Sequence, residues 1–147
     1  MVDFSLTDEN RLVQQSVRAF AEAEILPQIR RWDEDGGFPR ELFGRMAEQG
    51  FLGAPIPERY GGSGMDYISF AILCEELERA DTAFRVVQSV HVGLNSLALL
   101  QWGTEEQRQR WLVPQAKGEK LATFGLTEPG VGTDAGNLAM TARRDGG

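Results

Sequence analysis

Helix-capping residues followed by apolar residues at helical spacing recur through the first 120 residues, and this pattern limits the fold most. Thr7, Asp66 and Asp81 each precede such a segment, and their side chains can accept hydrogen bonds from the free N–H groups of a helix N-terminus. Residues 104–107, Thr-Glu-Glu-Gln, are typical of a capping box on a further short helix. The pattern predicts an all-α helical bundle over residues 1–120.

Proline and glycine predict where these helices break. Pro27 is expected to bend or interrupt the first helix before Trp32, because proline lacks an N–H and crowds the preceding turn. Residues 35–37, Asp-Gly-Gly, predict a turn. Pro39 is expected at the first position of the second helix, which Gly50 ends.

The pattern changes near residue 121, where an extended segment begins. We therefore expect two regions: an N-terminal helical domain over residues 1–120, and the first strands of a second, β domain over residues 121–147. The chain ends in Asp145-Gly146-Gly147, and Asp-Gly is a frequent hairpin turn. A chain that stops in such a turn is expected to be a piece of a longer protein.

Composition excludes several classes of function. The net charge of −7 argues against a general nucleic-acid binder, because no basic stripe is present to neutralise phosphates. With a single cysteine, Cys74, and a single histidine, His91, a metal site is unexpected. The single cysteine also fits a reducing compartment. No apolar run approaches the roughly 18 residues of a membrane span, and residues 1–5 do not resemble a secretory signal. We expect no membrane insertion.

A glycine-rich turn near the end of the chain matches the dinucleotide-binding pattern G-x-G-x-x-A over residues 130–135. That pattern requires a helix immediately after the turn, so that a pyrophosphate can sit at the helix N-terminus. Here Gly136 and Asn137 follow at once, and residues 138–141 show no helical periodicity. We therefore reject a nicotinamide dinucleotide site at this turn.

The longer string around this turn, Leu126-Thr127-Glu128-Pro129-Gly130-Val131-Gly132-Thr133-Asp134, resembles the L-T-E-P-x-x-G-S-D signature of the acyl-CoA dehydrogenase family. Similar strings of that family occur upstream in the same order and spacing. They are Tyr60-Gly61-Gly62-Ser63-Gly64, Glu75-Glu76-Leu77 and Gly103-Thr104-Glu105-Glu106-Gln107-Arg108. The resemblance covers essentially the whole chain. It implies an α+β protein whose N-terminal helical bundle is followed by a β-barrel middle domain and a C-terminal helical bundle.

The resemblance also implies an activity. Members of the family use FAD to oxidise an acyl-CoA thioester to the enoyl-CoA, in fatty acid or amino acid catabolism. They are typically homotetramers, re-oxidised by an electron-transfer flavoprotein. The family's catalytic base is usually a glutamate of the C-terminal domain, so we expect no catalytic residue in this chain. The compartment is expected to be the bacterial cytoplasm or the mitochondrial matrix.

Residues that contact the cofactor are implied by position in the signature. Phe124, Leu126 and Thr127 are expected to line the flavin, with the Thr127 hydroxyl bonding its pyrimidine edge. Gly132 and Thr133 are expected where the cofactor meets the thioester end of the substrate. The family usually has serine in place of Thr133; the hydroxyl is kept, and an extra methyl is added. Plain turn chemistry is the alternative for both threonines.

Arg85 and Ser89 are the second predicted site. They lie one turn apart on a helix expected over residues 82–103. Glutaryl-CoA dehydrogenases are similar here, since they carry Arg and Ser at this spacing to hold the distal carboxylate of a dicarboxylyl-CoA. A guanidinium suits this role because its fork meets a carboxylate bidentately. The alternative is a solvated arginine paired with Glu78 or Asp81.

The remaining candidates are interpreted as structural. His91 is expected to pack in the core with one bonded nitrogen, and Trp32, Trp102 and Trp111 to anchor helix packing. Two other functions stay open. One is an acyl-CoA oxidase, in which dioxygen takes the electrons, and the other is a non-catalytic helical module that binds a partner.

Overall fold

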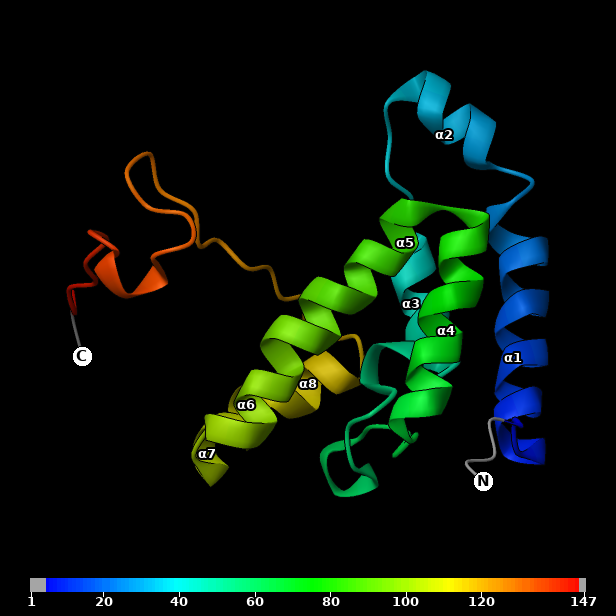
Figure 1. The fold of residues 1–147 in the computed structure, drawn as a ribbon, viewed down its shortest axis with the longest axis horizontal. Helices are drawn as coiled ribbons and strands as arrows, with labels where there is room; N and C mark the ends of the chain where they lie inside the picture. The colour runs from blue at the N-terminus through cyan, green and yellow to red at the C-terminus, as the bar shows by residue number, and fades with distance from the viewer. Residues whose placement is uncertain (1–4, 146–147) are drawn as a thin grey trace.

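The computed structural model describes residues 5–145. The predictions for the N-terminal residues 1–4 and for the turn through Gly146 lie outside this range. The described chain forms a helical body and a long arm, defined here as residues 121–145, which extends away from the helices (Figure 1). The prediction of a helical bundle is confirmed.

The helical body is built from short helices, several of them joined end to end. Their bounds are α1 (Asp8–Phe20), η1 (Ala21–Ile25), α2 (Ile29–Asp35), α3 (Glu41–Glu48), η2 (Phe51–Gly53), η3 (Glu58–Tyr60), α4 (Tyr67–Ala80), α5 (Thr82–Val87), η4 (Gln88–Ser96), α6 (Leu97–Trp102), α7 (Glu105–Gln107), η5 (Arg108–Leu112) and α8 (Val113–Ala116). Segments η1, η4 and η5 are π-helical, whereas η2 and η3 are 3₁₀ turns. α5, η4 and α6 follow one another without a break and form one long helix, Thr82–Trp102 (Figure 1).

The predicted caps are present. The Asn10 N–H donates to the Thr7 hydroxyl over 3.1 Å, and the Ser69 N–H donates to the Asp66 carboxylate over 2.6 Å. The capping box of residues 104–107 also forms. Pro39 is a correction: it precedes α3 by two residues, because Arg40 is the N-cap.

The main core lies where α1 packs against α4, with α3 and η2 beside them (Figure 1). Leu73 and Leu77 of α4 are completely buried, as is Val17 of α1. A buried carboxylate joins the same two helices, because Glu76 accepts two hydrogen bonds from Arg18, at 2.6 and 3.0 Å. Helical spacing of apolar residues thus gave α1, α3 and α4 their buried faces.

The glycine-rich loop before α4 is tightly packed. Gly61 has a left-handed φ of 81°, and a Cβ at Gly62 would lie 2.0 Å from the carbonyl oxygen of Ile56. The Tyr60 hydroxyl donates to Glu105 over 2.8 Å and so connects this loop to α7. Two of the family-like strings, around Tyr60 and around Glu105, therefore serve the packing of the helical body.

His91 is a second correction. It was expected to have one bonded nitrogen, but both are bonded: Nε2 lies 3.1 Å from the Gln115 carbonyl oxygen, and Nδ1 accepts the Ala122 N–H over 3.0 Å. The second bond was not foreseen because Ala122 is 31 residues away in the sequence.

The expected strands of residues 121–147 are not formed within the described part of the arm. Its backbone is extended, with one isolated bridge between Glu128 and Val131 and one 3₁₀ turn, η6 (Ala135–Asn137). A strand requires a neighbouring strand to pair with, and the described arm supplies none beyond that bridge. The assignment of this segment to a β-barrel domain, and the boundary at residue 120, stay predictions.

The long helix comes closer to a membrane span than the sequence analysis expected. By length and composition alone, Thr82–Trp102 could cross a membrane, a test that core helices of soluble proteins also pass. His91 and Ser96, however, are buried on it and hydrogen-bonded to Gln115 of α8. These polar contacts favour a helix that packs within protein.

Candidate cofactor and substrate site

Four polar side chains form a cluster at the N-terminal end of the long helix, three from that helix and Glu78 from the end of α4. Arg85 Nε donates to the Glu78 carboxylate over 2.6 Å, and Arg85 Nη1 donates to the Ser89 hydroxyl over 3.2 Å. Thr82 donates to the other Glu78 oxygen over 2.8 Å. The structure thus brings Arg85 and Ser89 into contact, and it also pairs Arg85 with Glu78.

Arg85 and Glu78 each stabilise the charged form of the other. The hydrogen bond to Glu78 raises the pKa of Arg85, and the hydrogen bonds from Arg85 and then Thr82 lower the pKa of Glu78. Both groups are therefore ionised at neutral pH. The Arg85 side chain is 36% exposed, so its guanidinium can be reached from solvent while Glu78 holds it in place.

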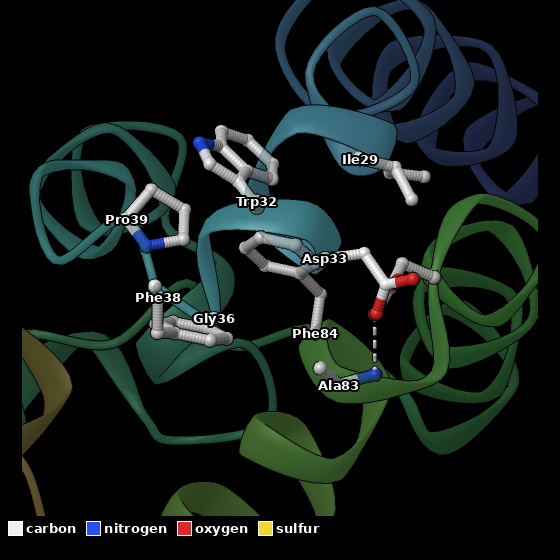
Figure 2. Close-up of a pocket in the computed structure, with 10 residues that line it drawn as sticks. Ile29, Trp32, Asp33, Gly36, Phe38, Pro39, Ala83 and Phe84 are labelled. Atoms are coloured by element: carbon white, nitrogen blue, oxygen red, sulfur yellow. Dashed lines mark hydrogen bonds between the residues drawn. The ribbon is translucent and has the colours of Figure 1, made fainter.

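Aromatic packing fixes the helix end that presents Arg85. A hollow of 320 Å³ is bounded by Trp32, Phe38 and Phe84, which are among the side chains that Figure 2 draws as sticks. The Phe84 ring lies 5.9 Å from that of Trp32 and 5.2 Å from that of Phe38, and the Ala83 N–H donates to Asp81 over 2.7 Å. The expectation that Trp32 anchors helix packing is confirmed. Because Phe84 directly precedes Arg85, this aromatic packing fixes the position of α5 (Thr82–Val87), and with it the position of Arg85.

The arm presents the five residues expected at the cofactor. Phe124, Thr127, Gly132 and Thr133 are exposed, and Leu126 is half-buried. Added Cβ atoms at Gly130 and Gly132 would meet nothing within 4 Å. The arm therefore offers hydroxyl groups, an aromatic face and open backbone on one short segment.

Glu128 shapes this segment, a role that the sequence analysis missed. Its backbone pairs with Val131 in both directions, at 3.0 and 3.1 Å. Its carboxylate accepts the N–H groups of Ala139 and Met140, at 2.8 and 2.9 Å. Residues 129–138 are thereby closed into a loop that carries Gly132 and Thr133. A glutamate eleven residues before its partner has no periodic signal in the sequence.

The turn after Gly130 leads into η6 alone, a single 3₁₀ turn. A dinucleotide site needs a helix N-terminus at this position.

The arm meets the long helix at Phe124. A hollow of 470 Å³ is lined by Phe124 from the arm, by Leu94 and Trp102 from the long helix, and by Trp111 from η5. Trp102 is 79% exposed, so its expected role as a packing anchor is wrong for the described residues. Trp111 is 40% exposed, and Lys120 Nζ lies 4.5 Å from its indole centroid. The long helix thus has the Arg85–Ser89 pair near one end and this hollow near the other.

The remaining site residues are not brought together. Among the described residues, no hydrogen bond joins Thr127 or Thr133 to the Arg85 cluster. Likewise, no group of three or more His, Cys, Asp or Glu side chains in the described part of the chain could hold a metal ion.

Comparison with known proteins gives consistent matches. Residues 7–119 match the family model of the acyl-CoA dehydrogenase N-terminal domain. The short-chain specific acyl-CoA dehydrogenase of Clostridium acetobutylicum is 43% identical over 145 residues, which are 99% of this chain and 38% of that protein.

Two solved structures extend the likeness to the fold. A glutaryl-CoA dehydrogenase of Mycobacterium smegmatis in complex with FADH2 has a TM-score of 0.88 and 34% identity, over 96% of this chain and 36% of that chain. A structure of the electron transferring flavoprotein of Acidaminococcus fermentans contains a chain with a TM-score of 0.88 and 38% identity, over 92% of this chain and 36% of that one. This chain therefore spans less than two fifths of each relative.

Proposed function

The chain belongs to the acyl-CoA dehydrogenase family, and we propose that it forms the N-terminal helical part of an enzyme that oxidises an acyl-CoA thioester to the enoyl-CoA with FAD. The observation that carries this proposal is the match of residues 7–119 to the family's N-terminal domain, continued by the signature on the arm. Residues outside this chain supply the catalytic base in this proposal.

The arm fits a flat, polar cofactor. Phe124 and Leu126 offer apolar surface, Thr127 and Thr133 offer exposed hydroxyls, and Gly132 leaves room for close approach. These are the residues that would hold FAD, a cofactor seen as FADH2 in the matched Mycobacterium structure. When bound, the flavin supplies the hydride acceptor. A hydroxyl bonded to the edge of its ring favours the reduced, anionic form.

The finer proposal is that the substrate is a dicarboxylyl-CoA such as glutaryl-CoA. Its support is the Arg85–Ser89 contact and the partial exposure of the guanidinium. The matched Clostridium relative is short-chain specific, and a short monocarboxylic acyl-CoA is the competing substrate. The two substrates differ in one carboxylate, and Arg85 is the one arginine of Thr82–Trp102 that can bind it bidentately.

Partners and compartment follow from the family. We propose an electron-transfer flavoprotein as acceptor, since a chain similar to this one occurs in a structure of such a protein. A homotetramer is part of the same proposal. A bacterial cytoplasm or a mitochondrial matrix is consistent with the single cysteine.

The first test is the visible absorption spectrum of the protein, purified from its source at the length the cell makes. We expect a flavin band that bleaches anaerobically when an acyl-CoA is added. A colourless protein that takes up no FAD would contradict the dehydrogenase and the oxidase alike, and would favour a helical module that binds a partner. Peroxide formed in air during turnover would indicate the oxidase.

The second test addresses the substrate. In the complete enzyme, Arg85→Ala should lower kcat/KM for glutaryl-CoA by about a hundredfold, the loss of a charged hydrogen bond of roughly 1.5–3 kcal/mol. The value for butyryl-CoA should change little. Arg85→Lys, which keeps the charge and loses the fork, is the matched control. Equal losses with both substrates would rule out the dicarboxylyl preference.

A further inference from the structure

His91 is buried, 2% exposed, and bonded at both ring nitrogens. The Ala122 N–H can only donate, so Nδ1 must accept and carries no proton. Nε2 therefore holds the proton and donates it to the Gln115 carbonyl oxygen, 3.1 Å away. The two partners fix one tautomer of a neutral imidazole.

Ser96 links the backbone of His91 to the side chain of Gln115. The Ser96 hydroxyl lies 3.0 Å from the His91 carbonyl oxygen and 3.0 Å from Gln115 Oε1. Ser96 and Gln115 are buried too. His91 thus sits in a network that spans the long helix and α8, and one of its ring nitrogens faces the start of the arm.

We propose that His91 is a positioning residue for cofactor binding: its Nδ1 holds Ala122, and so sets where the arm residues Phe124 and Thr127 lie relative to the long helix. This inference rests on the proposed function, because it assigns the arm to FAD. Ala122 is two residues from Phe124, and the arm meets the helical body both at this bond and at the hollow around Phe124. His91 lies between Ser89 and Leu94 on the same helix. The long helix therefore carries the Arg85–Ser89 pair, the bond to Ala122 and part of the hollow around Phe124.

The tie responds to pH because only the neutral ring can accept from Ala122. A protonated imidazole has donors at both nitrogens and would leave the Ala122 N–H without a partner. The elements around His91 bring one charged group, Arg85 of α5, which is paired with Glu78; η2, α6 and α8 carry no titratable side chain. Lys117 and Lys120 lie in the connecting turn, with Lys120 over Trp111.

Burial lowers the pKa of His91, and the hydrogen bond with Gln115 opposes this shift. The unfolded value is 6.5. The stability that the neutral ring contributes is therefore fully present above pH 6.5, and the tie itself is lost as the pH falls through the lower folded pKa.

Two variants separate the two ring nitrogens. His91→Asn places an amide oxygen near the position of Nδ1 and can still accept from Ala122. His91→Gln places its amide near Nε2, so it can keep the Gln115 bond and lose the Ala122 bond. Neither side chain titrates. Each variant keeps one of the two hydrogen bonds, so a general loss of packing affects both.

The experiment measures hydrogen exchange at the Ala122 amide and the dissociation constant of FAD, both in the complete protein. We expect His91→Asn to stay near wild type in both. In His91→Gln, we expect the Ala122 amide to exchange about tenfold faster than in wild type. We expect the dissociation constant of FAD to rise about tenfold as well, the factor for one net hydrogen bond. Wild-type FAD affinity should weaken as the pH falls through the lowered pKa of folded His91, and the affinity of both variants should stay flat over the same range.

The outcomes distinguish the inference from the function it rests on. Equal Ala122 exchange in wild type and both variants overturns the tie, as does equal FAD affinity. If the wild-type protein binds no FAD, the proposed function is overturned. Hydrogen exchange at the Ala122 amide still tests the bond to His91 in that case, because it does not depend on FAD. If neither variant folds, the imidazole ¹⁵N shifts of wild type decide: a protonated Nδ1 in the native state contradicts the inference.

Discussion

The helical body and the arm contain similar apolar side chains, but these are buried in the body and exposed on the arm. Leu73, Leu77 and Ile56 of the body are completely buried, whereas Phe124 is 49% and Met140 78% exposed on the arm. The body therefore gains its stability from its own core. The arm is fixed by a few polar contacts, at Ala122 and at Glu128. Its exposed apolar residues remain available to a ligand or to protein outside this chain.

The largest test of this contrast uses one substitution at two places. Leu77→Ala should lower the free energy of unfolding by about 2–5 kcal/mol, because it removes buried methyl groups and leaves a cavity. Leu138→Ala on the arm, where the side chain is 40% exposed, should change it by less than about 0.5 kcal/mol. Chemical denaturation followed by circular dichroism gives both values. Similar losses would mean that the arm belongs to the cooperative core.

The second test concerns the buried carboxylate between α1 and α4. Hydrogen bonding from Arg18, followed by the charges of Arg18 and Arg79, lowers the pKa of Glu76. Its contribution to stability is therefore present above the unfolded value of 4.5 and is lost as the pH falls through the lower folded pKa. Glu76→Gln should remove this part of the acid dependence, at a smaller cost than Leu77→Ala.

Measuring unfolding at several pH values below 6 checks this. Glu75→Gln is the matched control, since Glu75 is the exposed neighbour, and its profile should follow wild type. An unchanged slope for Glu76→Gln would show that the pair does not couple folding to protons.

The two regions also differ in how far the sequence predicted them. Caps and apolar spacing act within one turn of helix, and so Thr7, Asp66 and the box at residues 104–107 were predicted correctly. Strand formation from residue 121 depends on a partner strand, which local sequence does not encode. The expected strands were therefore wrong for the described arm.

Contacts across long sequence separations account for the other misses. The bond from Ala122 to His91 spans 31 residues and the bonds of Glu128 span 11 and 12. Neither has a periodic signal, whereas Arg85 and Ser89, four residues apart, were correctly expected to share a face. Their roles toward a substrate, and those of the arm residues toward FAD, remain predictions.

The third test is a helix cap. Thr104→Ala removes the hydroxyl that accepts the Gln107 N–H over 3.2 Å, and should cost about 1 kcal/mol of unfolding free energy. Thr104→Ser keeps the hydroxyl and should stay close to wild type. Thr123→Ala, at an exposed position of the arm, is the comparison across regions and should be neutral. A neutral Thr104→Ala would mean that α7 adds nothing to the cooperative unit.

The smallest effect on stability is expected at Thr133, where function and folding separate most clearly. Thr133→Val and Thr133→Ser should both change unfolding by less than about 0.5 kcal/mol, because the side chain is exposed. In the complete protein, FAD affinity should distinguish them. Thr133→Ser keeps the hydroxyl and should bind as wild type does, whereas Thr133→Val should bind several-fold more weakly, the effect of one hydrogen bond of about 1 kcal/mol. Titration of the apoprotein with FAD measures this. If the Thr133→Val and Thr133→Ser variants bind FAD equally, the Thr133 hydroxyl serves only the turn. The arm's contribution to FAD affinity must then come from Phe124 and Thr127.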